Sequence, residues 1–410
     1  MIGIRLAAVM AWMTAAAPAW AATVEVPPGP LAPVVAAAAP GDVLRLAPGR
    51  HLGPVVIDKP LAIEGQPGAV VDGGGHGRVI QVSAPDVTIR AVDVTGSGLD
   101  LEAMDAGIFL DKAAVRAVVA DNRVLDNLVG VYVWGAADAR VEGNTIVGRQ
   151  DLRVNERGNG ISLWNAPGAR IAHNRINHGR DGIFVTTSRR NSFVGNHFNN
   201  VRFAVHYMYC NDSEVSDNVS EGNYVGFALM YSSGLTVSGN VSRGDRDHGV
   251  LLNYTNGSQV TGNRVTGGEK CVFVYNANKN RIADNLFQDC GIGIHFTAGS
   301  ERNVMTGNAF VANQVQVKYV GTRDVVWAEG RRGNYWSDNP AFDLDGDGIA
   351  DTAYRPNDVV DRVVWAVPLA KLLLNSPAVQ VVRWSQAQFP ALTPGGVVDP
   401  APLMRPVAAP

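Results

Sequence analysis

An asparagine recurs at a nearly constant interval through the middle of the chain. The positions are Asn122, Asn144, Asn174, Asn196, Asn218, Asn240, Asn263, Asn285 and Asn308, in steps of 22, 30, 22, 22, 22, 23, 22 and 23 residues. Each follows Gly, Asp or His, and a short apolar run such as Gly182–Val185 stands earlier in each period. A period this regular predicts a solenoid, which works through a long side surface.

The length of the period indicates which solenoid this is. Coils of 22–23 residues with short β-branched runs predict an all-β fold, a right-handed parallel β-helix with three short strands per coil. A leucine-rich repeat has a similar length, but its leucine-rich consensus and helical segment are missing. We expect the asparagines to stand at turns, where asparagine can adopt the left-handed conformation, and to stack into a ladder without chemistry of its own.

The beginning of the chain differs from the repeats. Arg5 precedes an apolar run, Leu6–Ala17, and Ala19 and Ala21 form an A-x-A cleavage motif. Residues 1–21 are therefore predicted to be a cleavable secretory signal peptide, and the mature protein is expected to be exported. The net charge of −3 gives no indication of a nucleic-acid partner.

Two further segments are expected after the signal. The β-helix is predicted over residues 22–332, with Val34–Ala39 forming one or two helical turns that cap its first coil. Residues 333–410 form a C-terminal segment with an Asp-rich loop and a Pro-rich end, Pro394–Pro410, that we expect to be mobile.

Alternation along each apolar strand separates inward from outward positions once the coils are aligned on their asparagines. The inward series read Ile183, Val205, Phe227, Val250, Val272, Ile294 and Val185, Tyr207, Leu229, Leu252, Val274, Phe296. The outward series read Phe184, His206, Ala228, Leu251, Phe273, His295 and Trp134, Trp164, Thr186, Met208, Met230, Asn253, Tyr275, Thr297. Because an exposed apolar stripe marks a docking or ligand surface, Trp134, Trp164, Phe184, Phe273, Tyr275 and His295 are predicted to bind partners. The alternative is that a loop or the C-terminal segment covers them.

One coil is longer than the others. The step from Asn144 to Asn174 is 30 residues, and its excess is assigned to Gln150–Gly158, a charged loop leaving the coil. Insertions in solenoids map to loops on one face, often the binding face.

The sharpest candidate metal site is formed by His206 and Met208, with Met230 one coil later. Residues two apart on one strand lie about 6–7 Å apart on the same face, and equivalent residues of adjacent coils about 4.8 Å apart. Imidazole and thioether ligands suit Cu(I), so these three residues predict a copper site. A docking surface explains the same residues, because methionine often fills gaps between apolar groups. Cys210 continues this outward series unless it already belongs to the turn.

The other cysteines are Cys271 and Cys290, 19 residues apart. A disulfide between neighbouring coils and buried unpaired thiols are both compatible with this spacing.

A second candidate metal site follows the last repeat. The carboxylates of Asp343, Asp345, Asp347 and Asp351 alternate with other residues as in the first half of a calcium loop. An EF-hand would place Glu at loop position 12, where this chain has Tyr354. Calcium binding and a carboxylate-capped turn that closes the solenoid both remain open.

Many exported parallel β-helices cleave or epimerise acidic polysaccharides, which requires carboxylates or an acid/base pair in a groove. Asp245, Asp247 and His248 are the best local candidates, with Asp181 and Asp212 elsewhere, but they do not share one column. An exported carbohydrate-binding protein, or a polysaccharide lyase or epimerase, is therefore one candidate function, the alternative to a protein without enzymatic activity.

Several stretches resemble the NosD family, the periplasmic β-helix proteins of nitrous oxide reductase maturation. They are Asp58–Gly65, Val71–Gly75, Ala84–Arg90, His206–Tyr209, Ala228–Ser232, Asn334–Ser337 and Asp343–Asp351, and the resemblance spans roughly Val43 to Leu374. It implies a role beside an ABC transporter made of the ATPase NosF and the membrane subunit NosY. It also implies that, with the copper chaperone NosL, these proteins assemble the copper–sulfide centre of nitrous oxide reductase, NosZ. The resemblance supplies no catalytic residue, and the chain has no phosphate-binding Gly-Lys-Ser/Thr loop.

Overall fold

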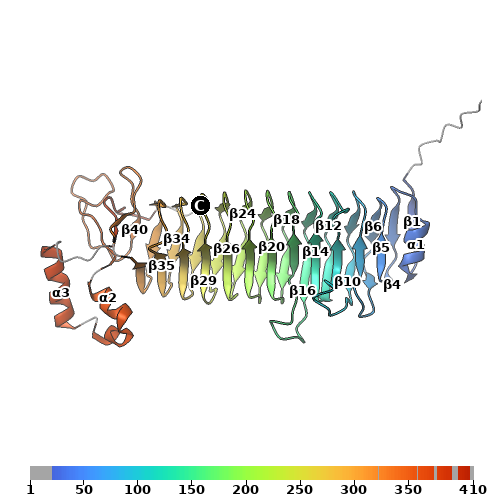
Figure 1. The fold of residues 1–410 in the computed structure, drawn as a ribbon, viewed down its shortest axis with the longest axis horizontal. Helices are drawn as coiled ribbons and strands as arrows, with labels where there is room; N and C mark the ends of the chain where they lie inside the picture. The colour runs from blue at the N-terminus through green and yellow to red at the C-terminus, as the bar shows by residue number, and fades with distance from the viewer. Residues whose placement is uncertain (1–20, 322, 358, 374–375, 390–395, 407–410) are drawn as a thin grey trace, which may run out of the picture.

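The computed structural model describes residues 21–321, 323–357, 359–373, 376–389 and 396–406. The predicted signal peptide lies outside the described residues except for its last residue, Ala21. The chain forms one long β-solenoid, which confirms the predicted parallel β-helix (Figure 1). Among the described residues, parallel strands build sheets of 13, 14 and 12 strands that run the length of the solenoid, together with a 2-stranded sheet near its C-terminal end.

Each coil contributes one short strand to each long sheet. Sheet A contains β1 (Thr23–Val26), β3 (Val43–Leu46), β6 (Ala62–Gly65), β9 (Thr88–Arg90), β12 (Val118–Ala120), β15 (Arg140–Glu142), β18 (Arg170–Ala172), β21 (Ser192–Val194), β24 (Glu214–Ser216), β27 (Thr236–Ser238), β30 (Gln259–Thr261), β33 (Arg281–Ala283) and β36 (Val304–Thr306). Sheet B contains β2 (Gly29–Pro30), β4 (Gly49–Leu52), β7 (Ala69–Asp72), β10 (Asp93–Thr95), β13 (Arg123–Asn127), β16 (Thr145–Gly148), β19 (Arg175–Asn177), β22 (His197–Asn199), β25 (Val219–Glu221), β28 (Val241–Arg243), β31 (Arg264–Thr266), β34 (Leu286–Gln288), β37 (Ala309–Val311) and β40 (Tyr335–Trp336).

Sheet C has the longest strands of the three. It contains β5 (Val55–Ile57), β8 (Ile80–Val82), β11 (Ala106–Leu110), β14 (Val129–Trp134), β17 (Ile161–Trp164), β20 (Asp181–Thr186), β23 (Phe203–Met208), β26 (Val225–Met230), β29 (His248–Asn253), β32 (Lys270–Tyr275), β35 (Ile292–Thr297) and β38 (Val315–Val320).

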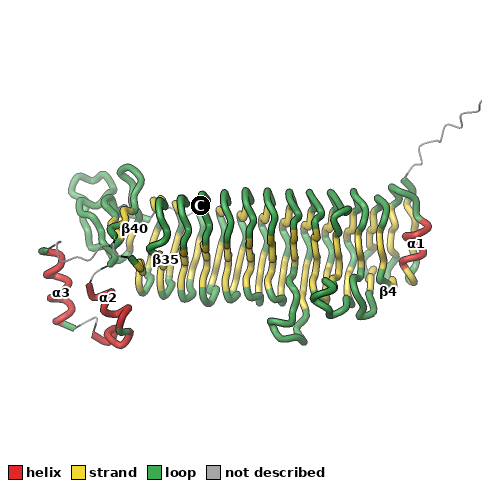
Figure 2. The backbone as a smooth tube through the Cα atoms, viewed as in Figure 1, coloured by secondary structure: helices red, strands yellow, loops and turns green. Residues whose placement is uncertain are grey.

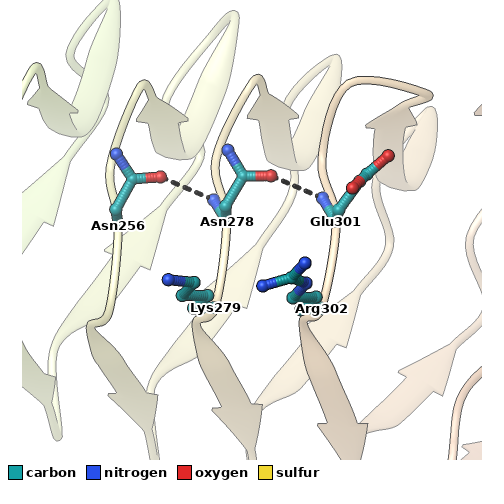
Figure 3. A pocket seen from close by; sticks show the side chains of 5 residues that line it. All are labelled: Asn256, Asn278, Lys279, Glu301 and Arg302. Atoms are coloured by element: carbon teal, nitrogen blue, oxygen red, sulfur yellow. Dashed lines mark hydrogen bonds between the residues drawn. The ribbon is translucent and has the colours of Figure 1, made fainter.

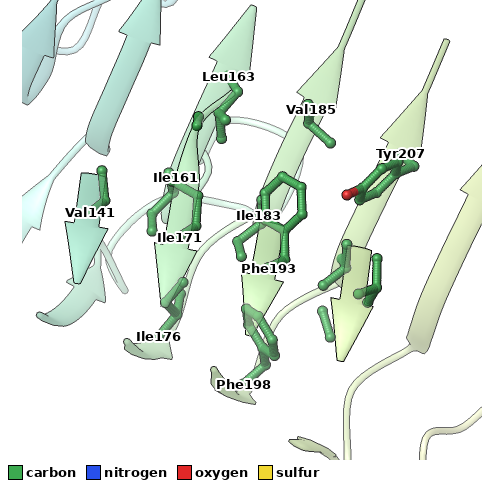
Figure 4. Close-up of a cluster of buried hydrophobic side chains, with 14 of the residues drawn as sticks. Val141, Ile161, Leu163, Ile171, Ile176, Ile183, Val185, Phe193, Phe198 and Tyr207 are labelled. Carbon is green, nitrogen blue, oxygen red and sulfur yellow. The ribbon is translucent and has the colours of Figure 1, made fainter. Parts of the chain in front are cut away.

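The core fills the space between the three sheets. Both predicted inward series are buried, with exposed fractions of 0–1%. Isoleucine, valine and phenylalanine of sheets A and B meet them from the other sides, as Ile171, Ile176 and Phe198 do around Ile183 (Figure 4). Tyr207 joins this core, with its ring 5.1 Å from that of Phe193.

The asparagines stack into a buried ladder at the turn between sheets A and B. The Oδ1 atom of Asn196 accepts hydrogen bonds from the backbone nitrogen and Nδ2 of Asn174, both at 3.0 Å. The Nδ2 atom of Asn196 donates to the carbonyl of Ile171 at 2.9 Å. The expected left-handed conformation falls instead on the preceding residue, as at His173 and Asp217, with φ of 55° and 54°. The preceding residue makes the bend, and the asparagine turns inward to satisfy buried backbone groups of neighbouring coils.

Helices lie near both ends of the solenoid. At the N-terminal end, α1 (Leu31–Ala37) buries Leu31 and Val35 against the first coils, so the helix begins earlier than the predicted Val34–Ala39. Near the C-terminal end lie α2 (Val359–Ala366), the 3₁₀-helix η1 (Pro368–Leu373) and α3 (Pro377–Gln388) (Figures 1 and 2). None of the helices in the described ranges is long and apolar enough to cross a membrane.

The Pro-rich end of the chain returns to the last coil. Strand β41 (Val397–Val398) pairs with β39 (Val325–Val326), and the buried Oδ2 of Asp399 accepts hydrogen bonds from Trp336 Nε1 at 2.8 Å and Asn334 N at 2.7 Å. For residues 396–406 the expectation of a mobile tail is therefore wrong. A buried carboxylate organises this segment, a role that Pro-rich composition does not reveal.

The structure also decides two local questions. Of the two alternatives for Cys271 and Cys290, it has the disulfide, with their Cα atoms 5.7 Å apart. The long coil places its excess residues in a loop between β16 and β17 that leaves the solenoid (Figure 2).

Candidate functional site

The outward side chains of sheet C lie in the register that the sequence alignment predicts. Phe184 pairs with His206 and His206 with Ala228 along one column, which continues through Leu251, Phe273 and His295. In the second column Trp134 pairs with Trp164, and Met208 with Met230. We refer to the outward side chains of β11 to β35 as the outer face.

The outer face is apolar and forms clusters separate from the main core. One cluster buries Ala106, Phe109 and Val129 beneath Met104, Tyr132 and Trp134. The other buries Val225, Ala228 and Leu251 beneath Phe203, Met230 and Phe273.

Solvent reaches part of this face. Trp164 and Tyr275 keep 38% and 41% of their surface exposed, so neither a loop nor the C-terminal segment covers these two rings. Exposed apolar groups gathered along one face are typical of a binding surface.

The predicted partner-binding residues separate into three aromatic groups. Trp134 and Trp164 stack at 5.3 Å. Phe184 contacts His206 edge-on at 5.0 Å. Further along, Phe273 lies 4.7 Å from His295 and 6.2 Å from Tyr275.

A tyrosine ladder beside this face escaped the sequence analysis. Tyr209, Tyr231 and Tyr254 follow successive strands of sheet C and stack at 5.1 Å, and each keeps at least 40% of its surface exposed. All three have positive φ, between 50° and 56°, which is unfavourable for bulky residues. Their spacing of 22 and 23 residues was the signal that could have revealed them. They extend the aromatic surface onto the turn.

His206 is held by a buried carboxylate that sequence analysis did not connect to it. Asp181, on the preceding strand, is completely buried and accepts a hydrogen bond from His206 Nδ1 at 3.0 Å. Arg202 donates to both oxygens of the same carboxylate, from Nε and Nη2, at 2.8 Å each. The rings of Phe184 and Phe203 lie 5.0 and 4.7 Å from the imidazole.

These contacts determine the ionisation of Asp181 and the tautomer of His206. Burial raises the pKa of Asp181, but the hydrogen bonds from His206 and Arg202 outweigh it, so the pKa lies below its ordinary value. An ionised carboxylate only accepts hydrogen bonds, so His206 Nδ1 carries the proton. An imidazole protonated on Nδ1 alone keeps its lone pair on Nε2, as in carboxylate–histidine–metal arrangements.

The two methionines lie next to this histidine. Met208 follows His206 by two residues on β23, and Met230 is paired with Met208 in register on β26. Both side chains are half-buried. The register thus places His206, Met208 and Met230 on one face of sheet C, with imidazole and thioether donors of the kind that Cu(I) prefers.

Cys210 does not belong to this set. Its side chain is buried in the core rather than continuing the outward series, and its Sγ donates to the carbonyl of Met208 at 3.2 Å. Burial raises the pKa of the thiol to about 11, so it is protonated at neutral pH and a poor metal ligand.

The candidate catalytic residues divide between different environments. Asp245 is buried at a coil corner, where Ser242 Oγ and Asn223 N donate to it at 2.6 and 2.8 Å. Asp247 lies 2.9 Å from His248 Nδ1 and 3.5 Å from Lys270 Nζ. Asp245 thus satisfies backbone and hydroxyl groups, while Asp247 and His248 form a separate pair at the edge of the outer face.

Neighbouring groups disfavour a charged imidazole further along this edge. Burial lowers the pKa of His248. Burial, with Lys318 and Lys270 nearby, lowers the pKa of His295 to about 4. Both imidazoles are therefore neutral at neutral pH.

The Asp-rich loop brings three of its four carboxylates together. Oxygens of Asp343, Asp345 and Asp347 lie within 4.8 Å of one another. Asp343 accepts from the backbone of Gly346 and Gly348 at 2.7 and 2.8 Å, and hydrogen bonds of this kind lower its pKa. Asp351 instead accepts from Leu344 N at 2.8 Å. The geometry suits both a capped turn and a partial calcium site.

A shallow cleft of about 520 Å³ lies at the turn between sheets C and A (Figure 3). Asn278 N donates to Asn256 Oδ1 at 2.9 Å, and Glu301 N donates to Asn278 Oδ1 at 2.7 Å. The side chains of Lys279 and Arg302 lie in equivalent places on neighbouring coils. This polar cleft borders the tyrosine ladder, because Asn276 Nδ2 donates to the Tyr254 hydroxyl at 3.0 Å.

The fold and the outer face together define a class, a β-solenoid with an aromatic- and methionine-rich binding side. Solved structures share the solenoid at low identity. The family 28 exopolygalacturonase of Yersinia enterocolitica matches with a TM-score of 0.56 and 10% identity, over 76% of this chain and 75% of that one. The Agl-KA catalytic domain matches with a TM-score of 0.50 and 11% identity, over 72% and 62%. Similarity at this level shows the fold alone.

Sequence relatives identify the family. Residues 142–341 match the family model described as periplasmic copper-binding protein (NosD). A probable ABC transporter binding protein NosD of Stutzerimonas stutzeri is 42% identical over 88% of this chain and 86% of its own length. A protein of the same name from Pseudomonas aeruginosa is 43% identical over 89% and 88%. The chain belongs to the NosD family, which confirms the resemblance read from its motifs.

Proposed function

We propose that this chain is a periplasmic, non-enzymatic accessory protein that assists an ABC transporter in assembling the copper–sulfur centre of nitrous oxide reductase. The partners proposed are the transporter subunits NosY and NosF, the copper chaperone NosL and the reductase NosZ. Support comes from the family's description as copper-binding and from its relatives' description as transporter-binding proteins. No residue is assigned a catalytic role.

The observation that carries the copper part of the proposal is the fixed imidazole of His206 beside two methionines in register. Asp181 holds Nδ1 at 3.0 Å, which orients the ring and leaves Nε2 as the donor atom. Met208 and Met230 then add two neutral thioether sulfurs from adjacent strands. Soft, neutral ligands of this kind favour Cu(I) over hard cations.

A Cu(I) titration of the mature protein against a competing chelator tests this assignment. We expect saturable binding that is lost in His206→Ala/Met208→Ala and weakened in Met230→Ala. Met404→Ala, which removes a methionine far from the outer face in sequence, is the control and should bind as the wild type does. Absence of Cu(I) binding to the wild type, or unchanged binding in the double variant, would refute the site.

The docking part of the proposal places partners along the outer face. Trp134, Trp164, Phe184, Phe273, Tyr275 and His295 would contact them, together with the tyrosine ladder. Immobilised wild type and Trp164→Ala/Tyr231→Ala would be compared for capture of purified NosL, NosZ and detergent-solubilised NosFY. Phe342→Ala removes an exposed ring from the Asp-rich region instead and should change nothing. Equal capture of all three partners by the double variant would contradict the docking assignment.

Calcium is proposed as a structural ion of the Asp-rich loop. Its ligands would be Asp343, Asp345 and Asp347, whose carboxylate oxygens already lie within 4.8 Å, with Asp351 completing the loop. Calcium at 1 mM-scale concentrations, on the order of the affinity of extracellular calcium modules, should raise the melting temperature of the wild type but not of Asp345→Asn. An equal effect of Mg²⁺, or no effect of Ca²⁺, would favour the capped turn.

A further inference from the structure

An arginine-lined cleft lies at the corner between sheets B and C, under the loop that leaves the long coil. Its volume is about 430 Å³, and its walls include Val154 and Arg157 of the loop and Arg202, Tyr224 and Arg246 of successive coils. The excess residues of the long coil therefore build one wall of a cleft, and neighbouring coils build the other.

The positive charge around this cleft lacks carboxylate partners. Among the described residues, no carboxylate oxygen lies within salt-bridge distance of Arg157, Arg180 or Arg246, whereas Arg202 is paired with Asp181. Arg157 donates instead to the carbonyls of Leu152 and Gln150, at 2.8 and 3.2 Å. Three arginines at one corner thus make no ion pair in a chain whose net charge is −3.

Buried polar atoms at the same corner also lack partners. The Nε atom of Arg180, next to the lining residue Gly179, is buried without a hydrogen bond, and so is His178 Nδ1. An unsatisfied buried donor costs about 1–3 kcal/mol, more when it is charged. Tyr224 and Val154 supply apolar walls, and the guanidinium of Arg246 lies 5.9 Å above the Tyr224 ring.

We propose that this cleft binds a small oxyanion, either an inorganic tetrahedral anion or a short polycarboxylate. Guanidinium groups recognise carboxylate and phosphate-like oxygens in paired hydrogen bonds, and an anion here would neutralise cations that the chain leaves uncompensated. The apolar walls leave room for a carbon skeleton. The inference does not depend on copper binding, because the cleft shares only Arg202 with the surroundings of His206 and none of the proposed copper ligands.

Isothermal titration of the mature protein with sulfate, phosphate and citrate, at constant ionic strength in chloride, tests the proposal. We expect at least one of these probes to bind the wild type, with affinity at least tenfold lower in Arg246→Gln and in Arg157→Gln/Arg246→Gln. The single variant leaves Arg157 and its hydrogen bonds within the loop in place, so a loss of binding there does not reflect a changed loop. The matched control, Arg175→Gln/Arg264→Gln, removes two exposed cations of sheet B outside the cleft.

The outcomes separate a site from general charge attraction. Binding retained in the control and lost in the cleft variants supports the proposal. Failure of all three probes to bind the wild type overturns it. Equal weakening in the cleft and control variants, or unchanged binding in Arg246→Gln, overturns it as well.

Discussion

Replacing Asp181 with Asn tests whether the carboxylate, rather than the histidine alone, prepares the proposed copper site. Three donors converge on the two oxygens of Asp181, namely Nε and Nη2 of Arg202 and Nδ1 of His206. An asparagine side chain offers one acceptor oxygen and one NH₂ group. If the amide oxygen of the new side chain accepts the hydrogen bond from His206, the amide nitrogen faces Arg202 Nε. Two hydrogen-bond donors then face each other. The imidazole either loses its fixed orientation or keeps it at the cost of the arginine contact.

The expected magnitude follows from this geometry. Removing the partner that orients a metal-binding histidine lowers metal affinity about 10–100-fold, which is roughly 1.4–2.8 kcal/mol. The lost negative charge acts in the same direction, since Arg202 would stand uncompensated near the bound cation. Because Arg202 is one-third exposed, water screens part of this second effect.

The assay is a chelator-competition titration with Cu(I), run beside urea unfolding followed by circular dichroism to verify that each variant is folded. Asp247→Asn is the matched control, because Asp247 contacts His248 at 2.9 Å but lies away from the methionines. We expect Asp181→Asn to weaken Cu(I) binding at least tenfold and Asp247→Asn to leave it unchanged. A folded Asp181→Asn protein with wild-type affinity, alongside a non-binding His206→Ala, would refute the orienting role of the carboxylate.

Three further outcomes are expected. Asn218→Ala removes the side-chain hydrogen bonds to Asn196, Phe193 and Asn240 and should lower the free energy of unfolding in urea by about 3–5 kcal/mol. The control is Asn253→Ala, because Asn253 Oδ1 has no partner among the described residues. This control should lower the free energy of unfolding by under about 1 kcal/mol. The pKa of His295 is about 4 in the folded protein, below the ordinary histidine value of 6.5, so the unfolded state takes up the proton first as pH falls. The free energy of unfolding should then decrease by about 1–2 kcal/mol as the pH falls from 6.5 toward 4. His295→Gln should reduce this decrease, whereas His76→Gln, at an exposed histidine, should not. Cys210 is buried with a pKa of about 11, so iodoacetamide at neutral pH should label the thiol only after unfolding, and rapid labelling of the native protein would contradict its burial.

Periodic features could be predicted because equivalent residues of successive coils occupy equivalent positions in the solenoid. The inward series around Ile183 and Val185 and the outward pairing of Met208 with Met230 follow from alternation once the coils are aligned. The disulfide was one of two alternatives at its spacing, and the structure selects it. The tyrosine ladder carried the same periodic signal but lies in turns, where alternation along a strand gives no guidance.

Contacts between different columns could not be predicted. The sequence by itself determined the solenoid, its buried asparagine ladder and the chemical character of the outer face, because these depend on a repeat and on local backbone geometry. Only the tertiary structure decided that Asp181 holds His206, that Cys210 turns into the core, and that Asp399 secures the chain end against the last coil. Each of these depends on where a side chain points after a turn and on the burial of a charge. The side-chain direction and the burial both depend on distances between coils. The order of residues along the chain does not give these distances.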